Sequence, residues 1–136
     1  MREILFRGKS FVTGGMVYGD LIQWKDGARD ILVSDRDTGE KTKFRVSPET
    51  VGQFTGFTDK NGKKIFEGDI LCDDECIGKI NYGGSSYTYE WKLRRYLKSD
   101  FYRNCILSDF ARLGNLEVIG NIHESPELLK EGVKNG

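Results

Sequence analysis

Val46–Leu71, with the sequence VSPETVGQFTGFTDKNGKKIFEGDIL, is the stretch that decides the fold. It alternates short apolar runs with turn residues and contains few reactive groups. Ser47-Pro48-Glu49 is typical of a helix start, because Ser can cap, Pro suits the first helical position and Glu suits the first turn. Gly52 follows closely, so this helix is expected to last about one turn.

The rest of this stretch predicts strands joined by tight turns. Residues 53–57 have the apolar alternation of a strand, and 64–66 return as its partner. Between them, Asp59-Lys60-Asn61-Gly62 predicts a hairpin turn, because Asn and Gly tolerate positive φ. Residues 67–69 predict a second turn that leads into Ile70-Leu71. The stretch therefore describes a β-rich scaffold.

The same pattern of short strands and Gly-containing turns continues on both sides. One region, residues 92–113, is ambiguous, because its apolar spacing suits a helix while its β-rich surroundings suit a strand and a loop. Ser125-Pro126-Glu127 predicts a C-terminal helix that Gly132 would end. Further strands are expected at residues 4–6, 16–22, 31–33, 42–46, 77–82, 87–91 and 116–122.

These patterns predict a mainly β protein, a β-rich α+β chain that forms a small β-barrel or roll with a short C-terminal helix. The chain has 136 residues, with 17 Gly and only 2 Pro, a balance that favours turns over long helices. No linker-like segment divides it, so 1–136 is expected to be a single domain. Within it, residues 1–46 could form an N-terminal sub-sheet before the core.

The charge and cysteine content restrict the functional classes. Lys plus Arg total 21 and Asp plus Glu total 21, so no global attraction to nucleic acid or an anionic membrane is expected. No apolar run is long enough to span a bilayer, and the first residues lack the apolar core of a signal peptide. Three Cys is an odd count. Free thiols in a reducing cytoplasm are the simplest interpretation.

Three separated blocks resemble one family. The first block is formed by residues 50–56 and 59–63, the second by 65–70 and the third by 117–128. Further likeness lies at Phe6-Arg7-Gly8-Lys9 and at 17–22. In these blocks the chain is similar to the YopX-like family of phage and prophage proteins, over most of its length except about 73–113. The resemblance implies an SH3-like β-roll, with a core at about 47–124 and an N-terminal strand extension, and a tendency to self-associate. It implies no enzymatic activity, no catalytic residue, and the cytoplasm of a bacterial host.

Metal binding is a weak alternative. Cys72, Cys76, Cys105 and the only histidine, His123, could in principle form a Cys₃His zinc site. The second pair is widely split, whereas structural zinc ligands usually come as close doublets. Ordinary half-buried thiols explain these residues better. We therefore expect no metal and no cofactor.

Catalytic arrangements are also poorly supported. Cys105 and His123 could serve as nucleophile and base, but their spacing does not favour this. Glu67 and Asp69 flank Gly68 and would share a strand face, yet Gly and Asp at this place are normal turn residues. The sequence contains no phosphate-binding glycine motif. A non-enzymatic protein is expected.

Cations alternate with aromatic residues in the segment 91–103, a composition that suits phosphate contacts and base stacking. The other interpretation is an apolar sheet face with a solvated basic face. The residues predicted to contact nucleic acid are Trp91, Arg94, Arg95, Tyr96, Lys98 and Arg103.

Two functional hypotheses follow. The first is a phage accessory protein that acts through contacts with a host or phage protein and through homo-oligomers, because an unpaired edge strand invites another copy. The second is a nucleic-acid-binding module that uses 91–103. Membrane association is not expected.

Overall fold

The computed structural model describes residues 3–82, 85–97, 99, 101–110 and 113–131. It divides into two compact units, Met1–Phe54 and Thr55–Gly136. The expectation of a single domain over 1–136, with a sub-sheet at 1–46, stays a prediction.

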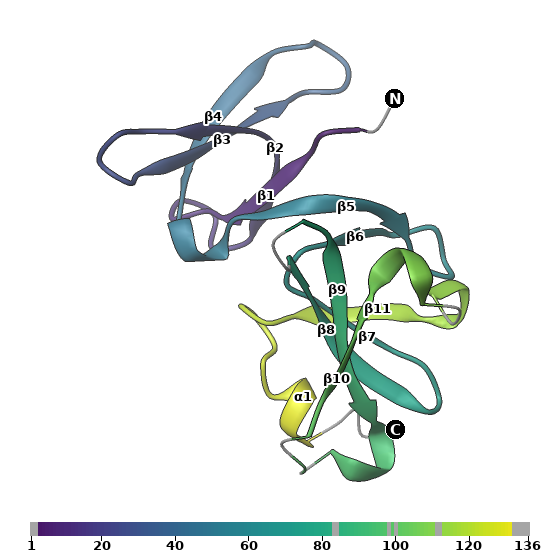
Figure 1. The fold of residues 1–136 in the computed structure, drawn as a ribbon. Helices are drawn as coiled ribbons and strands as arrows, with labels where there is room; N and C mark the ends of the chain where they lie inside the picture. The colour runs from purple at the N-terminus through teal and green to yellow at the C-terminus, as the bar shows by residue number, and fades with distance from the viewer. Residues whose placement is uncertain (1–2, 83–84, 98, 100, 111–112, 132–136) are drawn as a thin grey trace. The chain divides into compact units, whose positions relative to one another are not determined.

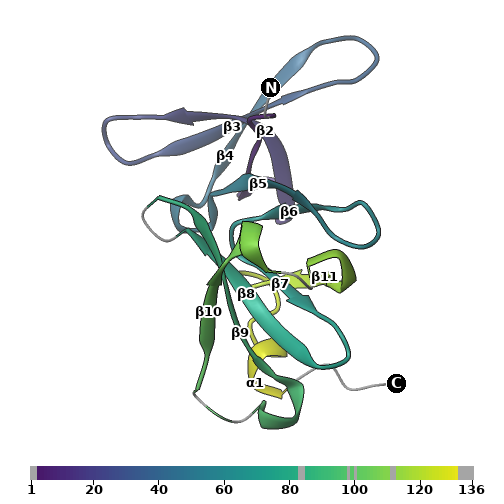
Figure 2. The same cartoon turned by 45° about the vertical axis from the view of Figure 1, so that its right-hand side comes forward.

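Over these residues the chain is mainly β, with two antiparallel sheets and one short α-helix (Figures 1 and 2). The strand orders are β4-β3-β2-β1-β5-β6 and β10-β9-β8-β7-β11. No helix in the described part of the chain has the length and apolar character needed to cross a membrane. The strands are β1 (Phe6–Lys9), β2 (Met16–Gln23), β3 (Arg29–Ser34), β4 (Lys41–Val46), β5 (Gly52–Thr58), β6 (Lys64–Phe66), β7 (Asp69–Cys72), β8 (Cys76–Tyr82), β9 (Tyr87–Leu93), β10 (Arg103–Ile106) and β11 (Glu117–Asn121), and the helices are η1 (Pro48–Thr50), η2 (Arg94–Tyr96), η3 (Leu107–Asp109), η4 (Leu113–Asn115) and α1 (Leu128–Glu131).

In the first unit, β2, β3 and β4 form a meander whose register places Asp30 directly opposite Arg45. Side chains alternate between faces along a strand, so Lys43 lies on the same face of β4 as Arg45. Ile31, one residue after Asp30, points to the other face and is fully buried. The unit therefore has an apolar face and a face with charged residues.

In the second unit, β7 is buried on both faces. Leu71 joins one apolar cluster with Ile80 and Tyr89, and Ile70 joins another with Ile77. Leu129 of α1 packs into the second cluster, so the short helix covers that face of the sheet. β7 is consequently held by apolar contacts on two sides, and the outer strand β10 is the most exposed of the sheet.

Three polar residues in the blocks that resemble a family hold turns. Asp59 accepts backbone N–H bonds from Asn61 at 2.9 Å, Lys63 at 2.8 Å and Val118 at 3.0 Å. Buried Asp69 accepts one from Phe66 at 2.7 Å, and Asn121 accepts from the two residues 123 and 124. These side chains fix backbone geometry.

The structure confirms the mainly β class and the short C-terminal helix, and corrects several details. No closed barrel forms over the described ranges, because β11 pairs with β7 and leaves β10 at the opposite edge. The helix predicted from Ser47 is a single 3₁₀ turn, and Ser47 makes no side-chain cap. In the turn after Asp59 only Gly62 has positive φ, at 80°. The predicted end at Gly132 lies outside the described residues.

Candidate functional site

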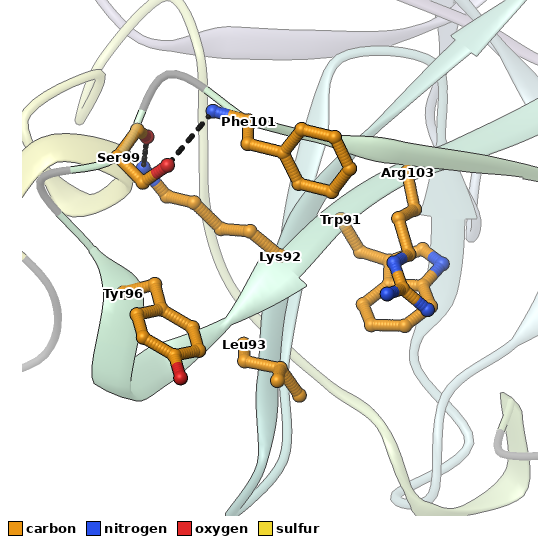
Figure 3. A pocket seen from close by; sticks show the side chains of 7 residues that line it. All are labelled: Trp91, Lys92, Leu93, Tyr96, Ser99, Phe101 and Arg103. Carbon is orange, nitrogen blue, oxygen red and sulfur yellow. Dashed lines mark hydrogen bonds between the residues drawn. The ribbon is translucent and has the colours of Figure 1, made fainter.

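A pocket of about 280 Å³ lies in the second unit, where β9 extends beyond its partner β10 (Figure 3). β10 starts at Arg103, opposite Trp91, so the last two residues of β9 have no partner in that strand. We call this cavity the β9-end pocket. Its walls are Trp91, Lys92, Leu93, Tyr96, Ser99, Phe101 and Arg103.

One wall of the pocket is a cation on an aromatic ring. Arg103 lies opposite Trp91 in the strand register, and its guanidinium carbon is 5.8 Å from the centre of the indole (Figure 3). The indole also packs against Phe110, 5.9 Å away between ring centres. Trp91 thus belongs partly to the apolar cluster and partly to the pocket.

Lys92, in the wall of the pocket, is bonded to residues that follow η2. Its side chain is only 5% exposed. The ammonium donates hydrogen bonds to the carbonyl oxygens of Leu97 and of Ser99, the latter at 2.9 Å, and lies 4.7 Å from the centre of the Tyr102 ring. A buried ammonium must be hydrogen-bonded to be tolerated. Lys92 is therefore occupied by structural contacts.

The structure separates the two neighbouring arginines. Arg94 donates from Nη1 to the carbonyl oxygen of Asp73 at 3.2 Å, which ties η2 to the turn before β8. Arg95 is exposed and lies 5.2 Å from the centre of the Tyr96 ring. Only Arg95 of this pair presents its guanidinium on an exposed aromatic side chain.

Of the six residues predicted to contact nucleic acid, three line the β9-end pocket: Trp91, Tyr96 and Arg103. Arg95 contacts Tyr96 from outside the pocket lining, and Arg94 is bonded to the turn at Asp73. Lys98 lies outside the described residues. Leu93, Ser99 and Phe101 also line the pocket and lie within the segment 91–103, but they are not among the six predicted residues, because the composition argument selects only cations and stacking aromatics.

Two of the thiols, those of Cys72 and Cys105, are in surroundings that disfavour the reactive thiolate. Burial raises the pKa of Cys72, which packs with Ile77. Burial also raises the pKa of Cys105, which packs on the other face of the sheet, near Tyr89. A raised pKa lowers the thiolate fraction near neutral pH. Within the described ranges, no three His, Cys, Asp or Glu residues gather as metal ligands would.

Asp69, which the sequence favours as a turn residue over half of an acid–base pair, has a backbone partner. Asp69 is almost fully buried and accepts the N–H of Phe66. Gly68, between Glu67 and Asp69, has a φ of 89°, a value that Gly adopts without strain. Asp69 therefore shapes the turn before β7.

Comparisons with known proteins agree on one family and one fold. The family model described as YopX protein matches residues 5–130. The crystal structure of protein EF1440 from Enterococcus faecalis is similar, with a TM-score of 0.54 and 26% sequence identity, over 95% of this chain and 99% of that chain. The search of curated proteins returned no match.

Proposed function

This chain belongs to the YopX protein family, and we propose that it is a non-enzymatic accessory protein that binds other proteins, including a second copy of itself. The proposal places its action in a phage or prophage setting, in the cytoplasm of a bacterial host, with an SH3-like core at about 47–124. These finer statements come from the family resemblance.

The observation that carries the proposal is the exposed strand β10 at the edge of its sheet. Edge strands offer backbone N–H and C=O groups to another chain unless something covers or repels it. β10 has one cation, Arg103, whereas the edge strand β4 of the other sheet carries exposed Lys41, Lys43 and Arg45. Charged edges resist pairing, so β10 is the edge better suited to it.

Apolar side chains beside β10 support the same conclusion. Phe101 is 67% exposed and lines the β9-end pocket, and Ile106 at the other end of β10 is also exposed. Two copies could pair their β10 strands antiparallel about a two-fold axis and cover these side chains. Such an interface would use shape and backbone hydrogen bonds, and no covalent bond would be made or broken.

Light scattering coupled to size-exclusion chromatography tests this pairing. The wild-type chain should elute as a dimer at high concentration, and the double variant Phe101→Lys with Ile106→Lys should be a monomer. The matched control is Phe11→Lys with Val12→Lys, because both side chains are exposed, at 68% and 78%, and belong to the first unit. A wild-type monomer, or equal dimers in both variants, would contradict the proposal.

A pull-down from infected or lysogenic cells after nuclease treatment tests for a host or phage protein partner. A His123→Ala variant and a Cys105→Ser variant should still capture the same proteins, because the proposal gives neither side chain a chemical role. Loss of capture in both variants, with folding unchanged, would point to chemistry instead.

A second candidate function is nucleic-acid binding by 91–103. It is favoured by the two guanidinium groups, of Arg95 and Arg103, that lie on aromatic rings. Arg94 is excluded from the test because it bonds to Asp73. Replacing Arg95 and Arg103 by Ala should weaken binding to DNA or RNA and flatten its salt dependence. The absence of any gel shift at low salt would remove this candidate.

A further inference from the structure

A second basic and aromatic cluster lies in the first unit, in a shallow depression of about 770 Å³. Its lining includes Trp24, Lys25, Lys43 and Arg45 together with residues of the turn that joins β2 to β3. We call it the Trp24 site. It comes from two separate parts of the chain, the end of β2 and the middle of β4, and involves none of the residues of the β9-end pocket.

A buried carboxylate fixes the orientation of the indole. Asp30 is 1% exposed. It accepts the Nε1–H of Trp24 at 2.7 Å and the Nε–H of Arg45 at 2.7 Å, one on each carboxylate oxygen. The Arg45 hydrogen bond and the Trp24 hydrogen bond hold the pKa of Asp30 below its usual value against the effect of burial. The carboxylate is thus charged at neutral pH and holds two side chains in place.

The indole remains open to solvent although its edge is fixed. Trp24 is 44% exposed, whereas a tryptophan that serves only the core hides most of its ring. Lys43 places its ammonium 5.6 Å from the centre of the ring. An exposed Lys on an aromatic ring is held weakly. The Lys43 ammonium can therefore leave the ring and pair with an anionic group of a ligand.

The charges around the ring are mostly positive. Lys25 is exposed beside Trp24, and Arg45 keeps 53% of its side chain accessible while it is paired with Asp30. Asp26, whose carboxylate accepts the backbone N–H of Ala28 at 2.9 Å, also lines the depression and places one negative group beside the three cations. A fixed aromatic ring with three accessible cations fits a ligand that combines a flat ring with negative charge.

We propose that the Trp24 site binds single-stranded nucleic acid, with a base stacked on the Trp24 indole and phosphates held by Lys25, Lys43 and Arg45. Base stacking on an aromatic side chain together with cations along the backbone is how sequence-tolerant single-strand binding works. An acidic peptide would satisfy the cations and leave the exposed indole unused. Single-stranded nucleic acid is therefore the better match to the whole set of residues.

Tryptophan emission provides a local test. The chain has 2 Trp, so the variant Trp91→Phe leaves Trp24 as the only tryptophan. Titration with an oligothymidylate at low salt should quench its emission to saturation. With about three phosphates neutralised, the affinity for a single strand should fall about 18-fold between 50 and 200 mM salt. No saturable quenching at low salt would overturn the proposal.

Two variants that each remove one cation distinguish binding at the Trp24 site from a general effect of positive charge on affinity. Lys43→Ala should weaken oligothymidylate binding about tenfold, whereas Lys130→Ala, which removes an equally exposed cation from α1, should leave it unchanged. Equal effects of the two variants would refute a local site. Since Lys43 is exposed, its loss should not impair folding, which circular dichroism verifies.

Poly-glutamate in place of the oligothymidylate distinguishes the two kinds of anion. We expect poly-glutamate to quench weakly, and oligothymidylate added afterwards should still quench the emission to its own saturation level. Poly-glutamate that binds as tightly as oligothymidylate would show a preference for charge alone and would overturn the assignment. Arg103→Ala, in the other unit, should not alter the quenching of Trp24. Binding at the Trp24 site can therefore be detected even if the β9-end pocket does not bind nucleic acid.

Discussion

The β9-end pocket and the Trp24 site both combine tryptophan with basic residues, yet they use their cations differently. At the β9-end pocket, Lys92 of the lining is bonded to two backbone carbonyl groups, and Arg94, outside the lining, is bonded to another. In the Trp24 site, Lys43 lies on an exposed indole and Arg45 keeps half of its side chain accessible. Among the described residues, Lys92 and Arg94 are thus used to hold the backbone, whereas Lys43 and Arg45 remain accessible.

The difference arises from how each region closes. After β9, the carbonyl groups of Leu97 and Ser99 accept hydrogen bonds from Lys92, and the carbonyl group of Asp73, in the turn before β8, accepts one from Arg94. Carbonyl groups outside the strand ladder need donors when water does not reach them, and these two cations supply them.

The β2–β3 turn is closed by its own backbone, because the N–H of Trp24 donates to Ala28 at 3.0 Å and that of Gly27 to Trp24 at 3.1 Å. One cation, Arg29, donates to the Ala28 carbonyl oxygen at 3.0 Å, whereas Lys43 lies on the indole and Arg45 bonds to Asp30, so the turn does not use these two.

Lys92→Met gives the largest expected effect, because it keeps the apolar stem and removes the buried ammonium. Two carbonyl groups lose their donor, and the free energy of unfolding should fall by about 3 kcal/mol. Urea denaturation followed by circular dichroism measures it. Lys130→Met, at an exposed position, is the control. A loss below about 1 kcal/mol would mean that Lys92 is as available as Lys43.

Asp30→Asn should have the next largest effect, about 2 kcal/mol, because an amide cannot accept from both Trp24 and Arg45 as the carboxylate does. Urea denaturation gives the loss of stability. In the Trp91→Phe background, the emission of Trp24 should also move to longer wavelength as the indole is released into water. Asp26→Asn, whose amide can still accept from Ala28, should change neither quantity.

Acid should remove the same contribution without a mutation. The pKa of Asp30 is lowered in the folded chain, first by the hydrogen bond from Arg45, so its stabilising effect is present above the pKa of the unfolded chain, about 3.9 for Asp. It is lost as pH falls through the lower folded pKa. The stability difference between the wild type and Asp30→Asn should be constant from pH 7 to 5 and shrink below pH 4.

A pH-independent difference between these two proteins would mean that the carboxylate charge is not what holds Trp24 and Arg45. Asp59 provides a comparison in the second unit. Burial raises its pKa, but the backbone N–H bonds from Val118, Lys63 and Asn61 outweigh this, and the net pKa is lowered. Both units should therefore lose stability in the same acidic range.

Much of the fold could be predicted because turns and strands leave local signals. The strand at 64–66 has the predicted bounds, since a hairpin turn precedes it and Gly68 ends it. β10 was not predicted, because Arg103–Ile106 has no apolar alternation and its place depends on pairing with Trp91. The predicted closed barrel is not found among the described residues. The pairing partners of β10 and β11 are set by contacts distant in sequence, which local patterns do not reveal.

The sites were less predictable than the fold. A run of basic and aromatic residues at 91–103 was visible, but the bond from Arg94 to Asp73 depends on a turn in another part of the chain. The Trp24 site was missed entirely, because Lys43 and Arg45 come from a different strand and Asp30 from a third. Only the register of β3 and β4 brings Asp30 and Arg45 together.

The smallest expected effect separates Arg94 from Arg95. Arg94→Ala removes the hydrogen bond to Asp73 and should lower the free energy of unfolding by about 1 kcal/mol. Arg95→Ala loses only an exposed contact with Tyr96, so its effect should stay within about 0.5 kcal/mol. Urea denaturation of the two variants side by side measures the difference. Equal losses would mean that Arg94 and Arg95 contribute equally to the free energy of unfolding. The hydrogen bond from Arg94 to Asp73 would then not distinguish it from its neighbour.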